Sequence, residues 1–334
     1  MVPWLVKLAH LVQLTRLTLA FTAVSNVWLM IFLATGLETQ IGGAGRVNPS
    51  LADKPLALVL LLGMVVAVGL HSYGMALNDM LDARHDRMFS PHRPIAAGRI
   101  SIRTGVAVAV LSLLLALLGA VLLGQIATFL CLLAAACILF FNGMGKYLPA
   151  MGILSLGLVR VLLMFLANPH AGFLWPVWVA MTHLMLCWAV AYRLEGKRPR
   201  LAAQQAWLLC AGWAGMSVLL LAWMRFRGGL VVADRPGLWI GAVVAGALFA
   251  IVTAMLLRPI GQGLRQRRQA GSAFLRAALL WLIAYDAGWL LGAGLYGPGI
   301  IHLALLAVAF ASERLRLAVD QLTAPPPVYR LVAE

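Results

Sequence analysis

Residues 56–86 read LALVLLLGMVVAVGLHSYGMALNDMLDARHD, and the architecture of the chain follows from this stretch. Residues 56–77 contain no Asp, Glu, Lys or Arg, and about 20 apolar residues in a helix are enough to span a bilayer. Three of the eleven acidic residues in the whole chain then follow within positions 79–86. The stretch therefore predicts a membrane-spanning helix with an acidic end.

The composition extends this interpretation to the whole chain. Its 334 residues are 63% hydrophobic and 11% charged, with a mean hydropathy of +0.93, which is typical of a polytopic membrane protein. We expect an all-α transmembrane bundle of nine to ten helices around a central cavity, forming one domain over 1–322, with an irregular tail at 323–334. The predicted apolar segments are about 11–36, 55–81, 102–123, 125–142, 149–167, 173–194, 203–224, 238–258, 272–296 and 299–318.

The basic residues indicate how the bundle is oriented. Of the 26 Lys and Arg, twenty fall in alternate loops and at the termini on one side, five fall on the other side, and Arg160 lies within a span. This bias predicts that both termini and the acidic cluster are cytoplasmic, in a multi-pass protein of the cell's inner (plasma) membrane. It also explains the net charge of +15 by topology and attraction to an anionic bilayer, which excludes a nucleic-acid partner.

The acidic cluster is the strongest indication of chemistry. Asp79, Asp82 and Asp86 are spaced so that they share one helix face, at the helix end where the macrodipole disfavours negative charge. A bound cation explains this arrangement, and Mg²⁺ holding a substrate phosphate is the leading candidate. The competing interpretation is a solvated helix end whose carboxylates pair with the neighbouring Arg84 and Arg87.

The loop after the cluster carries further cations. Arg93 and Arg99 can present guanidinium groups to a phosphate, although basic loop residues also arise from topology alone. Pro94 and Gly98 predict a turn that folds the loop back over the membrane surface, and Ser101 is a candidate N-cap for the next helix.

These motifs resemble the UbiA superfamily of intramembrane prenyltransferases. The resemblance lies in Asn78-Asp79-x-x-Asp82-x-x-x-Asp86, which matches the family's first aspartate-rich motif, and in the run from Arg93 to Ser101 that follows it. It implies Mg²⁺-dependent transfer of a prenyl group from a polyprenyl diphosphate to an apolar acceptor. Asp79, Asp82 and Asp86 would then be the metal-binding and catalytic residues, with Asn78 positioning them.

The resemblance also implies substrate-binding residues farther along the chain. Lys146, in the loop after the fourth segment, and Arg160, in the fifth, correspond to basic positions of the family. The family's second aspartate-rich motif falls where this chain has Tyr192, Arg193 and Glu195, with a single carboxylate. We therefore expect a divergent member in which these three residues contact substrate. Arg193 would pair with the phosphate directly, in place of the second Mg²⁺ of the family.

Two other function classes remain to be weighed. A non-catalytic or transport-type protein that binds prenyl lipids could use the same scaffold without chemistry. A CDP-alcohol phosphotransferase also uses membrane carboxylates and a metal, but its longer acidic pattern is absent from this sequence. Among the polar residues inside spans, Asp286, Asn26 and His183 are candidates for interhelical hydrogen bonds or for contact with the acceptor.

Overall fold

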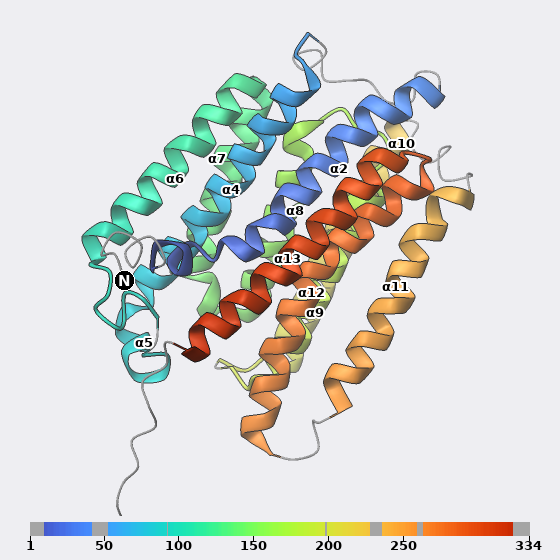
Figure 1. The fold of residues 1–334 in the computed structure, drawn as a ribbon. Helices are drawn as coiled ribbons and strands as arrows, with labels where there is room; N and C mark the ends of the chain where they lie inside the picture. The colour runs from blue at the N-terminus through green and yellow to red at the C-terminus, as the bar shows by residue number, and fades with distance from the viewer. Residues whose placement is uncertain are drawn as a thin grey trace, which may run out of the picture.

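The computed structural model describes residues 10–41, 53–91, 93–197, 199–227, 236–258 and 263–322, and this part of the chain contains helices and turns but no strand (Figure 1). The terminal segments 1–9 and 323–334, including the predicted tail, lie outside the described residues. The helices are α2 (Leu17–Ile41), α4 (Leu56–Leu81), α5 (Ala83–Phe89), α6 (Ile102–Leu123), α7 (Gln125–Gly143), the 3₁₀ helix η1 (Gly145–Tyr147), α8 (Pro149–Ala167), α9 (Trp175–Leu194), α10 (Ala203–Phe226), α11 (Pro236–Leu257), α12 (Leu264–Gly292) and α13 (Tyr296–Leu322).

Nine helices of the described chain are long and apolar enough to cross a membrane. They are α2, α4 and α6 to α12, and the tenth predicted segment, 299–318, lies within α13, which is not one of the nine. The all-α bundle with nine to ten helices is therefore confirmed. The central cavity and the single-domain boundary at 322 stay predictions.

Local sequence explains where several helices begin. Ser101 caps α6, since its hydroxyl accepts a hydrogen bond from the backbone N–H of Thr104 at 3.1 Å. Gly124 separates α6 from α7 with a φ of 132°, a value that favours glycine, so the two helices form a tight hairpin. Pro149 and Pro176 lie in the first turns of α8 and α9, where a missing backbone N–H costs nothing.

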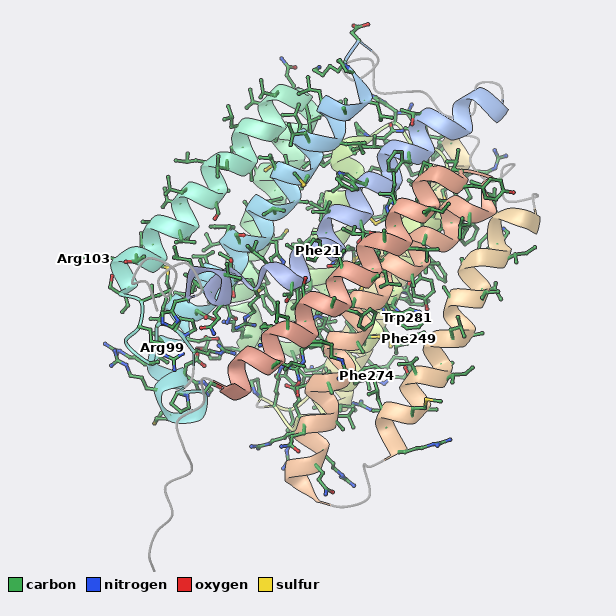
Figure 2. All side chains as sticks on the ribbon, in the orientation of Figure 1. Phe21, Arg99, Arg103, Phe249, Phe274 and Trp281 are labelled. Atoms are coloured by element: carbon green, nitrogen blue, oxygen red, sulfur yellow. The ribbon has the colours of Figure 1, made fainter. Side chains whose placement is uncertain are left out.

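Small residues allow the helices to pack closely. Where α11 crosses α12, a side chain at Gly241 would collide with the backbone of Gly288, so both positions must lack a Cβ. Below this crossing, Phe249 of α11 lies between Phe274 and Trp281 of α12, with ring centroids at 6.1 and 5.9 Å (Figure 2). The outer faces of α6, α10 and α11 instead expose large apolar side chains, as expected of surfaces that face lipid.

Helix α2 runs through the bundle and packs against α4, α8, α12 and α13 (Figure 1). The short helix α5 and the start of α6 lie at the end of the bundle where α4 finishes (Figure 1). This arrangement brings a residue from before α2, the end of α4 and the loops after α5 and α7 to the same end of the molecule.

Candidate functional site

The acidic motif lies where α4 passes into α5. Asp82 joins the two helices with φ −86° and ψ 0°, outside the α-helical region. The backbone N–H of Asp82 donates to the carbonyl of Asn78 at 3.0 Å, and that of Asp86 donates to the carbonyl of Asp82 at 2.8 Å. The i to i−4 hydrogen bonding thus continues through the junction, and the carboxylates of Asp79, Asp82 and Asp86 stay on one face.

Two of these carboxylates are withdrawn from solvent. Asp79 is 2% exposed and Asp86 is 3% exposed, whereas the side chain of Asp82 keeps a quarter of its surface. Burying a carboxylate costs several kcal/mol unless a cation or hydrogen-bond donors compensate, on the order of 3–5 kcal/mol when a partner is removed. The folded chain must therefore supply positive charge at this point.

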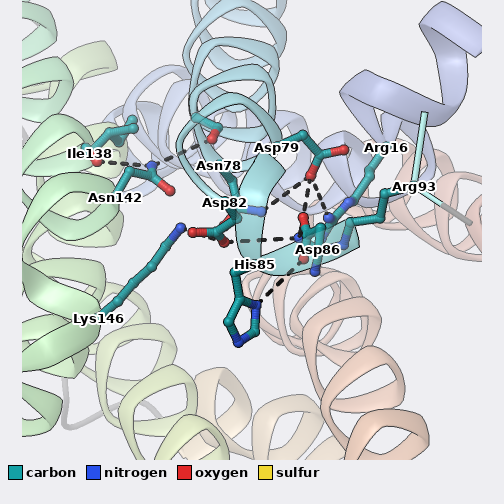
Figure 3. Close-up of polar contacts among 11 residues, drawn as sticks. Arg16, Asn78, Asp79, Asp82, His85, Asp86, Arg93, Ile138, Asn142 and Lys146 are labelled. Atoms are coloured by element: carbon teal, nitrogen blue, oxygen red, sulfur yellow. Dashed lines mark hydrogen bonds and ion pairs between the residues drawn. The ribbon is translucent and has the colours of Figure 1, made fainter. Parts of the chain in front are cut away.

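Three basic residues from three separate segments supply it (Figure 3). Arg16, which precedes α2, contacts Asp79 with Nη2 to Oδ1 at 2.9 Å. Arg93, in the loop after α5, contacts Asp86 with Nη1 to Oδ2 at 2.6 Å. Lys146 of η1 contacts Asp82 with Nζ to Oδ2 at 2.7 Å. Each carboxylate thus has its own cation, and neither Arg84 nor Arg87 is among these partners.

The guanidinium of Arg93 lies where the three carboxylates converge. Its Nη1 is also 3.7 Å from Asp79 Oδ1 and 3.9 Å from Asp82 Oδ2. Within the residues that the structure describes, no three His, Cys, Asp or Glu side chains form a ready metal site. The oxygen donors nevertheless suit Mg²⁺, and Arg93 Nη1 marks the point that attracts a cation from all three. A metal ion could bind there only if Arg93 moved aside.

Burial perturbs the charged groups of this cluster. It raises the pKa of Asp86 above its ordinary value, although the charge of Arg93 beside it acts in the opposite direction. Burial likewise lowers the pKa of Lys146, against the effect of its ion pair with Asp82. Both charged forms are therefore held at a cost, and an anionic ligand with its own cation would relieve that cost.

Arg16 is a site residue that sequence reasoning missed. It lies at a break between the helical turns of 10–15 and α2, with a φ of 46°, a left-handed conformation that is uncommon outside glycine. This conformation separates the two helical segments at the residue that pairs with Asp79. Because Asp79 is 63 positions away in the chain, no local pattern marked Arg16 as its partner.

Two asparagines border the cluster. Asn78 donates from Nδ2 to Asp79 Oδ1 at 3.2 Å, which agrees with the predicted positioning role without testing it. Asn142 at the end of α7 donates from Nδ2 to the carbonyls of Ile138 and Gly74, at 3.0 and 3.4 Å (Figure 3). Its Oδ1 is buried and has no hydrogen-bond partner. A buried acceptor without a partner is rare in folded proteins and marks Asn142 as a further candidate ligand-binding residue.

The remaining predicted residues do not join the cluster's ion pairs. Arg99 is exposed near the start of α6 (Figure 2), and Arg193 is exposed at the end of α9. The hydroxyl of Tyr192 donates to the carbonyl of Pro199 at 2.7 Å. Glu195 pairs with Lys197, Oε2 to Nζ at 2.8 Å.

Arg160 also lies apart from the acidic motif. Its Nη1 donates to Asn26 Oδ1 at 2.7 Å and to the carbonyl of Thr22 at 3.3 Å, both on α2. Asn26 and His183 make the expected interhelical contacts, since His183 Nε2 lies 2.9 Å from the carbonyl of Ala278 on α12. Arg160 thus belongs to a second polar region of the bundle.

These features define an integral, multi-pass helical membrane protein with an ion-paired polar site at one end of its bundle. The sequence profile of the UbiA prenyltransferase family matches residues 29–269, and the chain belongs to this family. The match includes the acidic motif, Lys146, Arg160 and the loop at 192–200, and it ends before most of α12 and all of α13. A search of curated protein sequences finds no match to this chain.

Two solved structures are similar to this chain at low sequence identity. A digeranylgeranylglyceryl phosphate synthase superimposes with a TM-score of 0.53 at 16% identity, over 86% of this chain and 98% of the synthase. A UbiA homologue from Archaeoglobus fulgidus, solved with GPP and Mg²⁺, gives a TM-score of 0.43 at 15% identity, over 90% and 98% of the two chains. At 16% identity, the likeness to the synthase concerns the fold alone.

Proposed function

We propose that this chain is a Mg²⁺-dependent prenyltransferase that moves a prenyl group from a polyprenyl diphosphate to an apolar acceptor within the membrane. Membership of a prenyltransferase family supports the reaction class. The observation that carries the proposal is the one-to-one pairing of Asp79, Asp82 and Asp86 with three cations at the end of an apolar bundle. Such a site suits a ligand with a charged head and a long apolar tail.

The pairing suggests how the site accepts this ligand. The three carboxylates and their partners Arg16, Arg93 and Lys146 sum to no net charge. When a diphosphate arrives with Mg²⁺, the carboxylate oxygens hold the metal, and the three basic side chains turn from the carboxylates to the phosphate oxygens. Each group would keep a partner of opposite charge in this exchange, so none would be left buried alone.

The same groups favour departure of the diphosphate. The bond between the allylic carbon and the diphosphate oxygen breaks, and its electron pair stays on the diphosphate. Bound Mg²⁺ would neutralise part of that growing charge. Arg16, Arg93 and Lys146 stabilise the rest by hydrogen bonds that strengthen as the charge develops. The allylic carbon then bonds to the acceptor, which loses a proton.

Other residues complete the proposed donor site. Asn78 would orient Asp79, and the unpaired Oδ1 of Asn142 would bind a metal-bound water or a protonated phosphate oxygen. Contact of Tyr192, Arg193 and Glu195 with substrate stays a prediction. The same is true of Arg99.

The test measures diphosphate release by the purified protein in lipid nanodiscs, with Mg²⁺, radiolabelled geranylgeranyl diphosphate and a lipid extract that supplies the acceptor. Asp82→Asn and Asp79→Asn should each lower the rate at least about a hundredfold, since each removes charge that acts on the leaving group. Asp53→Asn, an exposed carboxylate ahead of α4, is the matched control and should leave the rate unchanged.

Two results would contradict the proposal. Full turnover by correctly inserted Asp82→Asn would exclude the acidic motif from catalysis. Tight binding of the labelled diphosphate by the unmodified protein, with no release of diphosphate in the presence of lipid extracts, would favour the alternative of a prenyl-lipid binding or transport protein.

A further inference from the structure

The loop after α9 lies where the family carries its second aspartate-rich motif, and its residues do not suit a second Mg²⁺. Residues 192–200 read YRLEGKRPR, with one carboxylate and four basic side chains. Mg²⁺ needs several oxygen ligands, and a surplus of positive charge repels it. The one carboxylate, Glu195, is already paired with Lys197. The loop therefore offers the cation of a side chain where the family holds a metal ion.

The turn at the end of α9 folds this cation back onto its own helix. Gly196 has a φ of 62°, the left-handed conformation that glycine adopts after a helix C-terminus. The N–H of Lys197 donates to the carbonyl of Tyr192, and the N–H of Gly196 donates to the carbonyl of Arg193, both at 3.3 Å. These two bonds form a Schellman motif, which reverses the chain and brings Lys197 over the last turns of α9.

Three side chains of α9 and its C-cap surround the ammonium group of Lys197. Its Nζ is 2.8 Å from Glu195 Oε2, 5.1 Å from the centre of the Trp188 ring and 5.9 Å from the centre of the Tyr192 ring. The negative faces of aromatic rings attract a cation at such distances. The side chain of Lys197 nevertheless keeps 38% of its surface. Its charge is therefore held in one place and remains accessible to a ligand.

The face of α9 that carries this cation points into the bundle. Trp188, Tyr192 and Glu195 recur at helical spacing on one side of the helix, and Tyr192 is buried. Leu186 and Arg193 are exposed and lie seven residues apart, on the opposite side. Lys197 thus lies over the inner side of α9, whereas Arg193 extends from the outer side.

A ring contact joins this inner face to the diphosphate site. Trp188 meets Phe141 of α7 edge to face, with ring centroids 5.9 Å apart. Phe141 directly precedes Asn142, which borders the acidic motif, and η1 follows with Lys146, the partner of Asp82. The ends of α7 and α9 that carry Lys146 and Lys197 are therefore in contact at the same end of the bundle.

We propose that Lys197 takes the place of the second Mg²⁺, so that the protein binds its prenyl diphosphate with a single metal ion. The ammonium group of Lys197 leaves Glu195 and binds a phosphate oxygen, while Asp79, Asp82 and Asp86 hold the one metal ion. Lysine suits this exchange because its charge is compact and its four-carbon stem is flexible. The inference rests on the proposed prenyl diphosphate site.

The experiment counts the Mn²⁺ ions bound by the full-length protein in nanodiscs with geranylgeranyl S-thiolodiphosphate, an analogue whose carbon–sulfur bond resists cleavage. Electron paramagnetic resonance should show one Mn²⁺ per protein at saturation. Lys197→Met keeps an apolar stem over the rings but removes the charge, and it should weaken binding of the analogue by about tenfold or more. Lys197→Arg keeps the charge and should restore most of the affinity.

Two further variants sharpen the result. Arg200→Gln removes an exposed cation from the same loop and should leave the affinity unchanged. Glu195→Gln separates the two interpretations of this carboxylate. Loss of a metal ligand would weaken binding of the analogue, whereas loss of a group that competes with phosphate for Lys197 should maintain or strengthen it. Thermal unfolding confirms the fold of each variant, and Glu195→Gln provides the result if Lys197→Met does not fold.

Two Mn²⁺ ions per unmodified protein would overturn the inference. Equal losses in Lys197→Met and Arg200→Gln would also overturn it, because they would reflect the total charge of the loop and not the position of Lys197. A loss in Arg193→Gln without one in Lys197→Met would assign the role to Arg193. Failure of the analogue to bind the unmodified protein would instead contradict the proposed function.

Discussion

Arg93 and Arg99 lie six positions apart in one loop, yet the structure separates them. Arg93 contacts all three carboxylates of the motif within 3.9 Å, whereas Arg99 is exposed. The turn that Pro94 and Gly98 form accounts for the difference, since the N–H of Arg99 donates back to the carbonyl of Pro94 at 3.0 Å. Similar residues in one motif thus meet different surroundings.

Removing Arg93 should strengthen metal binding before substrate arrives. Arg93→Ala removes the cation at the point where the carboxylates converge, so the apparent Kd for Mn²⁺, measured by electron paramagnetic resonance without substrate, should fall about tenfold. Binding of prenyl diphosphate should weaken in the same variant. Arg99→Ala is the matched control and should change neither. An unchanged Mn²⁺ affinity in Arg93→Ala would place the metal elsewhere.

Helix α12 connects the polar region around Arg160 and Asn26 to the outer helix α11. Its Asp286 accepts a hydrogen bond from Asn26 of α2, and its Gly288 lies against Gly241 of α11, so its position determines both this polar region and the packing of the outer helix. The sequence placed this segment at 272–296, while the helix begins at Leu264. The first turns of this helix contain several arginines. Their low hydropathy assigns them to a loop, although their backbone is helical.

The crossing of α11 and α12 should be sensitive to a single methyl group. Gly241→Ala would push the new Cβ into the backbone of Gly288, and overpacking of this kind costs about 1–3 kcal/mol. We expect a lower melting temperature in detergent, measured by fluorescence-detected size exclusion after heating.

Gly246→Ala is the control on the same helix. A Cβ at Gly246 would meet only Tyr285, at ordinary contact distances of 3.7 and 3.8 Å. Since alanine favours the helix by up to about 1 kcal/mol over glycine, its melting temperature should hold or rise. Equal destabilisation by both substitutions would refute the close crossing.

At the scale of the whole molecule, the proposed chemistry depends on which side of the membrane the acidic motif faces. Helix α4 carries the motif at its C-terminal end, so Asp53 and Met88 lie at opposite ends of this span. Both side chains are exposed, Met88 to 74%. The charge bias of the loops predicts that Met88 is cytoplasmic.

Cysteine labelling tests this orientation. In a variant without native cysteines, Asp53→Cys should react with a membrane-impermeant maleimide in intact cells. Met88→Cys should react only after permeabilisation. The reverse pattern would place the motif on the outer side and contradict a cytoplasmic supply of prenyl diphosphate.

The sequence by itself determined the helices and the acidic face. Uninterrupted apolar runs predict spans because an unpaired backbone cannot cross lipid, and the spacing of Asp79, Asp82 and Asp86 predicts one face because a helix turns every 3.6 residues. Lys146 and Arg93 could also be predicted as site residues, because they lie in motifs with a recognisable spacing. These are local properties, and they survive in the folded chain.

Only the tertiary structure decided which charges meet. Arg16 pairs with Asp79 across 63 residues, and Asp286 reaches Asn26 across 260, through contacts that no periodic pattern records. Hydropathy places a residue in or out of the membrane, but the packing of whole helices determines its partners.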